Sequence, residues 1–300
     1  MRIAITHLTR YRYQPQVDNA KHMAYLTPTE HAHQQLISHS LRITPEPDEC
    51  ESRLDIYNNV RVFFSIQAPH TVLTVEALSV VSTSARPILH SDALWEQVQE
   101  QFRYRAQAPY HSATEFAFAS PCVPMHAHFL AYALPSFPQG ARLLDCAYAL
   151  MGRIHHDFIY ETHSTQVHTP ILQALEQKRG VCQDFAHIMI ACLRAMGLPA
   201  RYVSGYLLTH PPEGQERLVG CDASHAWASL FVPDASDTNA LDNEASGQWL
   251  DFDPTNNRTP SDDYVTLATG RDFADVSPLR GVILGGANHI LEVEVTVAPL

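Results

Sequence analysis

The segment that most constrains the fold lies between residues 180 and 208. Apolar side chains recur at helical spacing after Cys182 until Gly197 and Pro199 end the pattern. The apolar stripe consists of Phe185, Met189, Cys192 and Met196. A β-prone run at 200–208 follows at once. The pattern predicts a helix over 182–196, with a cysteine at its N-terminus and a strand directly after it.

Cys182 lies where a helix can make a thiol reactive. The partial positive charge of a helix N-terminus, together with a nearby histidine, stabilises the thiolate, which is the nucleophilic form. Amide groups of the first turn can also donate to an oxyanion, although the sequence does not identify a second donor. A buried structural cysteine is the alternative, and Cys192 on the apolar stripe fits it. Cys182 precedes the stripe, so it is the candidate nucleophile.

A histidine and an aspartate follow at the ends of two predicted strands. His225 opens the run 226–232, and Asp253 closes the run 248–252. A thiol nucleophile needs a base, and the base needs an acceptor that fixes its tautomer. We assign these roles to His225 and Asp253. Asp251 shares the strand face of Asp253 and is the rival acceptor, and turn aspartates at strand ends are the structural alternative for both.

These stretches resemble the bacterial transglutaminase-like superfamily. The resemblance is carried by GVCQDFAH at 180–187, RAMGLPARYVSGY at 194–206, HAW at 225–227 and DPTN at 253–256. HLTRYRY at 7–13 also resembles the family's N-terminal β domain, although Asn58-Asn59 stands where a Gly-Asn turn is expected. The resemblance implies a triad of Cys182, His225 and Asp253, with all three positions intact.

The resemblance also implies a fold and a reaction. The expected fold class is α+β: a papain-like core, with the nucleophile helix packed on an antiparallel sheet, preceded by an N-terminal β-sandwich-like domain. The expected reaction is acyl transfer through a thioester. We expect hydrolysis of amide or peptide bonds in a peptide or protein substrate, as by a cysteine peptidase or amidase.

Two other functions stay open at this point. A protein-glutamine transglutaminase would pass the acyl group to an amine and form isopeptide crosslinks. A catalytically inactive module that binds a peptide or protein is the alternative of another class. The intact triad disfavours this second alternative.

Three parts are expected along the chain. They are an N-terminal β domain at 1–85, a helical and catalytic core at 86–275, and a C-terminal strand segment at 276–300 that packs on the β domain. The first part contains several short alternating runs separated by prolines, which is typical of a sandwich or small barrel.

Within these parts, individual elements are expected as follows. Ser91 is expected to cap a helix that continues to Phe102, a second helix covers 142–156, and Thr169 with Pro170 starts a short helix ending at Lys178. The acidic stretch 233–247 is predicted to be a mobile loop near the active-site cleft. Residues 261–288 are predicted to be irregular, and 291–297 form a final strand.

Other chemically active side chains have plainer interpretations. Asp184 in the first helical turn suits the helix dipole, with a functional role as the alternative. His187, Trp227 and Tyr206 are expected to pack in the core. The pairs His31/His33 and His126/His128 have a spacing that could hold a metal on a strand. Because neither pair has cysteine or carboxylate partners in register, no metal and no cofactor are expected.

The charge and the apolar content of the chain limit the classes of partner and the location that we expect. The formal net charge of −12 argues against nucleic acid and anionic membranes, which need a basic surface. No 18-residue apolar run is present and the N-terminus lacks signal-peptide features, so a cytoplasmic location is expected. The six cysteines form no CxxC motif and are expected to be free thiols. Substrate-binding residues and oligomeric state stay unassigned.

Overall fold

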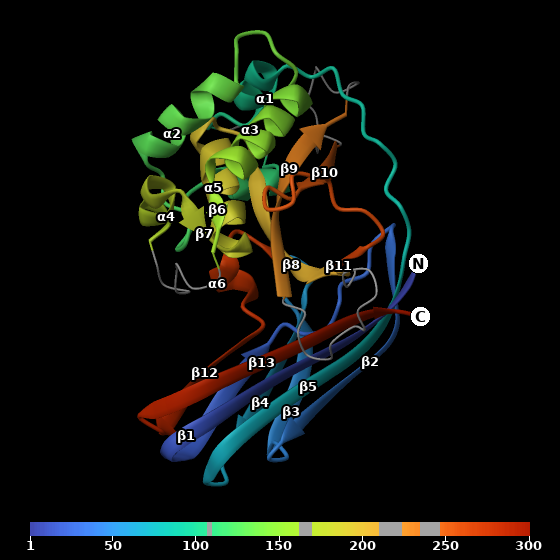
Figure 1. Cartoon of the computed structure of the whole chain (residues 1–300), viewed down its shortest axis with the longest axis vertical. Helices are drawn as coiled ribbons and strands as arrows, with labels where there is room; N and C mark the ends of the chain where they lie inside the picture. The colour runs from blue at the N-terminus through green and yellow to red at the C-terminus, as the bar shows by residue number, and fades with distance from the viewer. Residues whose placement is uncertain (107–109, 162–169, 210–223, 235–246) are drawn as a thin grey trace.

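The computed structural model describes residues 1–106, 110–161, 170–209, 224–234 and 247–300. Helices, a four-stranded core sheet and a large β-sheet follow one another along the longest axis (Figure 1). The α+β class predicted from the sequence is therefore present. Within the described ranges, no helix has both the length and the apolar character needed to cross a bilayer.

The large sheet has seven strands in the order β2-β5-β1-β4-β3, with β12 and β13 also paired to β1. Its strands are β1 (Arg2–Ala24), β2 (Gln34–Thr44), β3 (Glu49–Leu54), β4 (Val60–Ile66), β5 (His70–Thr83), β12 (Leu279–Gly285) and β13 (Asn288–Pro299). The first part of β1 pairs with β5 and β13, and its last part pairs with β4 and β12. A single 23-residue strand thus organises the β domain, which was expected to contain only short strands.

A tight turn between β3 and β4 explains the departure from a Gly-Asn pair. Asn58 adopts a left-handed backbone with φ of 63°, which asparagine tolerates better than most residues other than glycine. Asn59 donates from Nδ2 to Asp55 Oδ2 at 2.8 Å and to the Thr269 carbonyl at 2.7 Å. The turn therefore also attaches the β domain to the core sheet.

The core sheet has the order β10-β9-β8-β11, with antiparallel neighbours throughout. Its strands are β8 (Ala200–Leu207), β9 (Ser224–Pro233), β10 (Gly247–Phe252) and β11 (Tyr264–Gly270). The first three agree with the predicted runs to within two residues at each end. The acidic loop predicted at 233–247 lies almost wholly outside the described residues.

The prediction of an irregular segment at 261–288 is wrong. It contains β11, a short helix α6 (Phe273–Val276) and β12. Nearly every residue of β11 is buried, so its sequence lacks the alternation that marks a half-exposed strand. The final strand predicted at 291–297 is present as the longer β13.

The helical layer is formed by α1 (Trp95–Gln101), α2 (Ala127–Ala133), α3 (Leu143–Asp157), α4 (Ile171–Gln177) and α5 (Cys182–Ala195), with 3-10 turns at Ser112–Ala117 and Leu134–Ser136. The predicted cap Ser91 does not cap α1, because the N-cap of this helix is Leu94. The hydroxyl of Ser91 instead accepts from the Ala93 N–H, before the helix starts. Thr169, the predicted cap of α4, lies outside the described residues.

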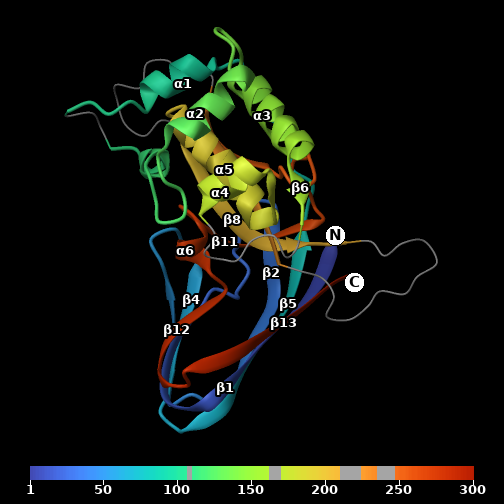
Figure 2. The same cartoon turned by 60° about the vertical axis from the view of Figure 1, so that its left-hand side comes forward.

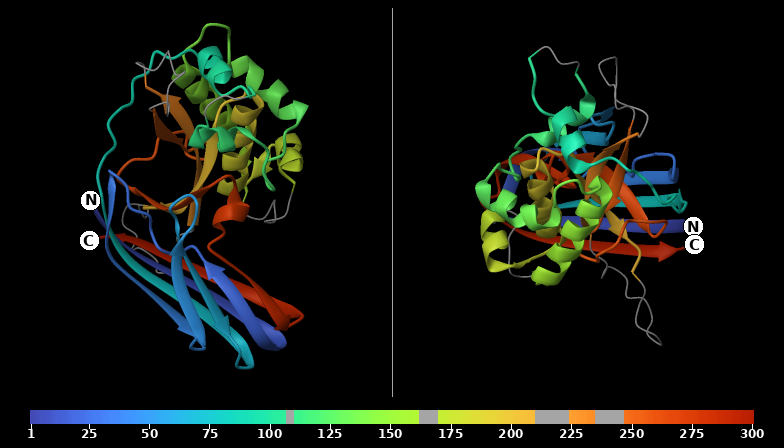
Figure 3. Two further views of the ribbon diagram at one scale, coloured as in Figure 1. Left: turned by 180° about the vertical axis from the view of Figure 1, so that it is seen from behind. Right: turned by 90° about the horizontal axis from the view of Figure 1, so that it is seen from above.

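The helices and the β domain cover different parts of the core sheet (Figures 2 and 3). Ala226, Ala228 and Leu230 of β9 pack in the same core cluster as α5. Tyr206 of β8 joins the core cluster of the β domain, and its hydroxyl lies 2.9 Å from Nδ1 of His7 on β1. The core sheet is thus held between α5 and the β domain.

Candidate active site

Cys182 is the first residue of α5, and two local interactions determine how the chain enters this helix. The preceding short strand β7 (Arg179–Gly180) pairs in parallel with β6 (Ile159–Tyr160). Asp184 then accepts from the Val181 N–H at 2.8 Å, which caps the helix. A Cβ at Gly180 would lie only 2.6 Å from Asp184 Oδ2, so this capping arrangement requires glycine there. Cys182 itself is partly exposed.

His225 and Asp253 come from adjacent strands of the core sheet. His225 is near the start of β9, and Asp253 directly follows β10. His225 Nε2 lies 2.7 Å from Asp253 Oδ2. The His225 side chain is 10% exposed and the Asp253 carboxylate is fully buried. The structure therefore brings the predicted base and its acceptor into direct contact.

Further donors hold the Asp253 carboxylate in place. Its Oδ1 accepts from the backbone N–H of Thr255 at 2.9 Å and of Asn256 at 3.2 Å. Its Oδ2 also accepts from Asn256 Nδ2 and from the Tyr264 hydroxyl, both at 2.7 Å. Burial acts to raise the pKa of Asp253, but the contacts with His225, Asn256 and Tyr264 outweigh it and lower the pKa. Asp253 therefore stays ionised.

The surroundings of His225 favour its protonated form. Burial disfavours the imidazolium, but the Asp253 carboxylate and the nearby Cys182 side chain raise the pKa of His225 to about 10. His225 thus pairs with the predicted acceptor and lies near the predicted nucleophile. The three residues form one connected set across α5, β9 and the end of β10.

Asp251, the rival acceptor, has other partners. It forms an ion pair with Arg86, from the segment that connects β5 to the helical layer. Burial acts to raise the pKa of Asp251, but the charge of Arg86 outweighs it and lowers the pKa. Residues 251 and 253 therefore serve two different clusters.

The remaining predicted side chains mostly pack in the interior. His187, Trp227 and Tyr206 are buried. His187 Nε2 accepts from the Phe273 N–H at 3.2 Å, and burial lowers the pKa of His187 to about 4. Cys192 is also buried, as expected for a structural cysteine. Cys221 lies outside the described residues.

Neither histidine pair forms part of a metal cluster. His126 and His128 lie at the start of α2 and not on a strand, because His126 is the N-cap and accepts from the His128 N–H. His31 Nδ1 accepts from the His33 N–H at 3.2 Å. Within the described ranges, no group of three or more histidine, cysteine or acidic side chains is arranged to hold a metal.

Tyr264 and Asn256 are site residues that sequence reasoning missed. Tyr264 lies on β11, in the segment predicted to be irregular, and Arg258 Nε donates to its hydroxyl at 3.0 Å. The β-prone residues of 264–270 were the available signal for this strand. Asn256 belongs to the DPTN stretch, but no role was assigned to it.

Comparisons with known proteins agree with this arrangement. Residues 3–82 match the family model of the bacterial transglutaminase-like N-terminal region, and residues 138–254 match that of the transglutaminase-like superfamily. An uncharacterized protein of Mycobacterium tuberculosis is 38% identical over 300 residues, covering 99% of this chain and 93% of the relative. One of Mycobacterium leprae is 32% identical over 303 residues, covering 100% and 99%.

A solved structure shows the same fold. The crystal structure of a "putative cysteine protease" from Cytophaga hutchinsonii matches with a TM-score of 0.72 at 21% identity, covering 99% of this chain and 90% of that chain. The two family models match both parts of this chain, and the sequence relatives align with nearly all of it. The chain therefore belongs to the transglutaminase-like superfamily, in the form that carries the bacterial transglutaminase-like N-terminal region.

Proposed function

We propose that the protein is a thiol-dependent acyl-transfer enzyme that hydrolyses amide or peptide bonds of a peptide or protein substrate. The observation that carries the proposal is the position of His225, which pairs with Asp253 at 2.7 Å and lies close enough to Cys182 for that side chain to raise the pKa of His225. Family membership and the fold shared with the Cytophaga hutchinsonii protein support the same class of chemistry. No cofactor enters the proposed reaction.

In the first half of the reaction, the Cys182 sulfur attacks the substrate carbonyl carbon. Because His225 Nε2 faces Asp253, its Nδ1 is the nitrogen left to exchange a proton with the thiol. The Cys182 N–H, which begins a helix and lacks an acceptor within that helix, donates to the oxyanion. The C–N bond then breaks as His225 protonates the leaving nitrogen, and a thioester remains on Cys182.

In the second half, water attacks the thioester carbonyl. His225 takes a proton from this water, and the carbon–sulfur bond breaks to release a carboxylic acid and restore Cys182. Asp253 fixes the ring orientation throughout and stabilises the imidazolium.

The test is the reactivity of Cys182 towards labelled iodoacetamide in the intact protein. At about pH 6.5, well below the range where a free thiol ionises, we expect Cys182 to be labelled ahead of the other thiols. His225→Ala should slow this labelling by about 10- to 100-fold, with His187→Ala as a matched control on the same helix as Cys182. Equal labelling of all accessible thiols, or unchanged labelling in His225→Ala, would contradict the proposal.

Substrate assays separate the remaining functions. Hydrolysis predicts release of new termini from casein, abolished in Cys182→Ala. Incorporation of a labelled amine into casein, also abolished in Cys182→Ala, would instead assign transglutamination. If Cys182→Ala kept the full biological effect of the protein, a binding module would replace both.

A further inference from the structure

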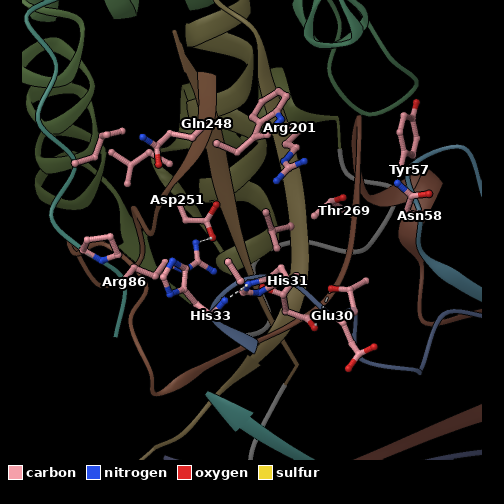
Figure 4. A pocket seen from close by; sticks show the side chains of 18 residues that line it. Glu30, His31, His33, Tyr57, Asn58, Arg86, Arg201, Gln248, Asp251 and Thr269 are labelled. Atoms are coloured by element: carbon pink, nitrogen blue, oxygen red, sulfur yellow. Dashed lines mark hydrogen bonds and ion pairs between the residues drawn. The ribbon is translucent and has the colours of Figure 1, made fainter. Parts of the chain in front are cut away.

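A cavity lies between the β domain and the core sheet. Its volume is about 490 Å³, within the size range of small-molecule sites. Residues 29–33 and the turn at 57–58 form one side, and β8, β10 and β11 form the other. Arg86 and Leu89, from the segment that links the two layers, complete the wall (Figure 4).

Arg201 supplies a cation on the inner wall of this cavity. It lies on β8, and its guanidinium carbon lies 4.2 Å from the centre of the Trp249 ring. Its Nε is buried and has no hydrogen-bond partner among the described residues. A guanidinium beside an aromatic ring, with a donor left unpaired, is well suited to bind a carboxylate or phosphate group.

The neighbouring side chains leave the positive charge of Arg201 without a dedicated carboxylate partner on that wall. Arg86 and Asp251 form an ion pair, so Arg86 already neutralises the nearest carboxylate (Figure 4). Burial, followed by the charge of Arg86, lowers the pKa of His31 to about 4, so His31 adds no positive charge near neutral pH. Glu30 also lines the cavity, but its carboxylate accepts from the Leu36 N–H at 3.2 Å on the β-domain side.

The cavity is separate from the site of Cys182. None of Cys182, His225 and Asp253 lines it. The fully buried Trp227 lies between the cavity and the site of Cys182. Its ring centre is 6.1 Å from that of His225. Val203, which pairs with Trp227 across β8 and β9, lines the cavity. A ligand in the cavity would therefore contact both domains without reaching the thiol.

We propose that this cavity binds a small organic anion, with the carboxylate or phosphate group of the ligand paired to Arg201. The apolar part of the ligand packs against Leu89 and Leu250, which also line the cavity. The ligand touches the β domain and the core sheet at once, so its binding adds to the contacts between them. The site is independent of the proposed hydrolysis.

Calorimetric titration of the full chain tests this proposal. The probes are sodium succinate and inorganic phosphate, with sodium chloride at matched ionic strength as the control. We expect saturable binding of at least one probe and no saturable signal from chloride. Arg201→Gln should weaken this binding by about tenfold or more, because it removes the charged fork. Arg103→Gln removes an arginine that is 71% exposed on the far helical layer and should bind as the wild type does.

A second variant covers the case in which Arg201→Gln fails to fold. Ala32 is exposed at the rim of the cavity, so Ala32→Trp should block entry while both arginines stay in place. No saturable binding of either probe to the wild type would overturn the proposal, as would unchanged affinity in Ala32→Trp or in a folded Arg201→Gln.

The two probes also distinguish the ligand class. Tighter binding of succinate assigns a carboxylate ligand, and tighter binding of phosphate assigns a phosphate ligand. Labelling of Cys182 by iodoacetamide, measured on the same Arg201→Gln sample, should not change. This readout separates failure of the anion site from failure of the proposed hydrolase.

Discussion

Two buried aspartates at the end of β10 lie two residues apart in very different clusters. Asp253 is paired with His225, a group that can release its proton, and it also accepts from neutral donors. Asp251 is paired with the guanidinium of Arg86 and also lies near Arg201, whose pKa is lowered by burial to about 10. The comparison teaches that a titratable partner gives a buried carboxylate a role in proton transfer. An arginine partner such as Arg86 instead keeps the carboxylate ionised and gives it a structural role.

The widest difference between the two clusters should appear as pH rises. The pKa of His225 is raised from its ordinary value of 6.5 to about 10. The stability that its charge contributes is therefore complete below about pH 6.5 and is lost as pH rises through about 10. We expect the difference in unfolding free energy between wild type and His225→Gln to shrink by several kcal/mol, about 1.4 kcal/mol per unit of pH. Urea unfolding at pH 6 and pH 9.5 measures it.

The Asp251 cluster is the internal control for that experiment. The lowered pKa of Asp251 means that its contribution is lost only in acid, as pH falls below its ordinary range. The difference between wild type and Asp251→Asn should therefore stay nearly constant between pH 6 and pH 8.5, and should change only as pH approaches the pKa of Arg201, which burial lowers to about 10. If the His225 difference stayed equally constant, the contrast drawn between the clusters would be wrong.

Asp251→Asn should produce the next largest effect. It leaves Arg86 and Arg201 without their nearest carboxylate, and removing one partner of a buried pair costs about 3 kcal/mol of unfolding free energy. Labelling of Cys182 should not change. Combining it with Arg86→Gln should cost less than the two single losses together, because the double variant no longer leaves the Arg86 charge unpaired. Strict additivity would show that the pair is not coupled.

Asp253→Asn should change the labelling of Cys182 more than it changes stability, which is the reverse of Asp251→Asn. It should slow iodoacetamide labelling of Cys182 by about tenfold, because an amide no longer stabilises the imidazolium or its correct tautomer. At pH 9.5, where the stability contributed by the imidazolium is nearly lost, its effect on the unfolding free energy should be smaller than that of Asp251→Asn. A larger loss of stability than in Asp251→Asn would break the comparison.

Tyr264→Phe should give the smallest change. It removes one donor to Asp253 and leaves the others in place, so we expect a loss of about 1 kcal/mol in unfolding free energy. Labelling of Cys182 should fall by about threefold or less. Tyr148→Phe, on the exposed side of α3, is the control and should be neutral. A loss as large as that of Asp253→Asn would assign Tyr264 a larger part in positioning His225.

Much of the proposed active site could be predicted because its parts carry local signals. The apolar stripe marks α5, which places Cys182 at a helix start, and strand-end positions mark His225 and Asp253. Tyr264 could not be found in this way, because β11 is buried on both faces and shows no alternation. Its contact with Asp253 exists only once the sheet has assembled.

The Arg201 cavity was beyond prediction for a related reason. Arg201 belongs to the RAMGLPARYVSGY stretch at 194–206, but nothing in that stretch marks its side chain as lining a cavity, and the cavity walls come from stretches far apart in the sequence. The spacing of His31 and His33 could fit a metal, although none was expected, and the fold places both at a cavity that Arg86, Arg201 and Asp251 also line. At Arg201, and at His31 and His33, the side chains that determine the local charge environment come from residues distant in the sequence.

The pairing of β1 with β13 has a consequence for how the protein is made. Ile3 lies opposite Pro299, and the two ends of the chain emerge side by side (Figure 1). During translation, the edge of β1 that β12 and β13 will cover stays bare until residues 279–299 have left the ribosome. An uncovered edge strand of this length readily pairs with other chains. The nascent protein therefore stays open to aggregation at this edge at least until β13 has been made.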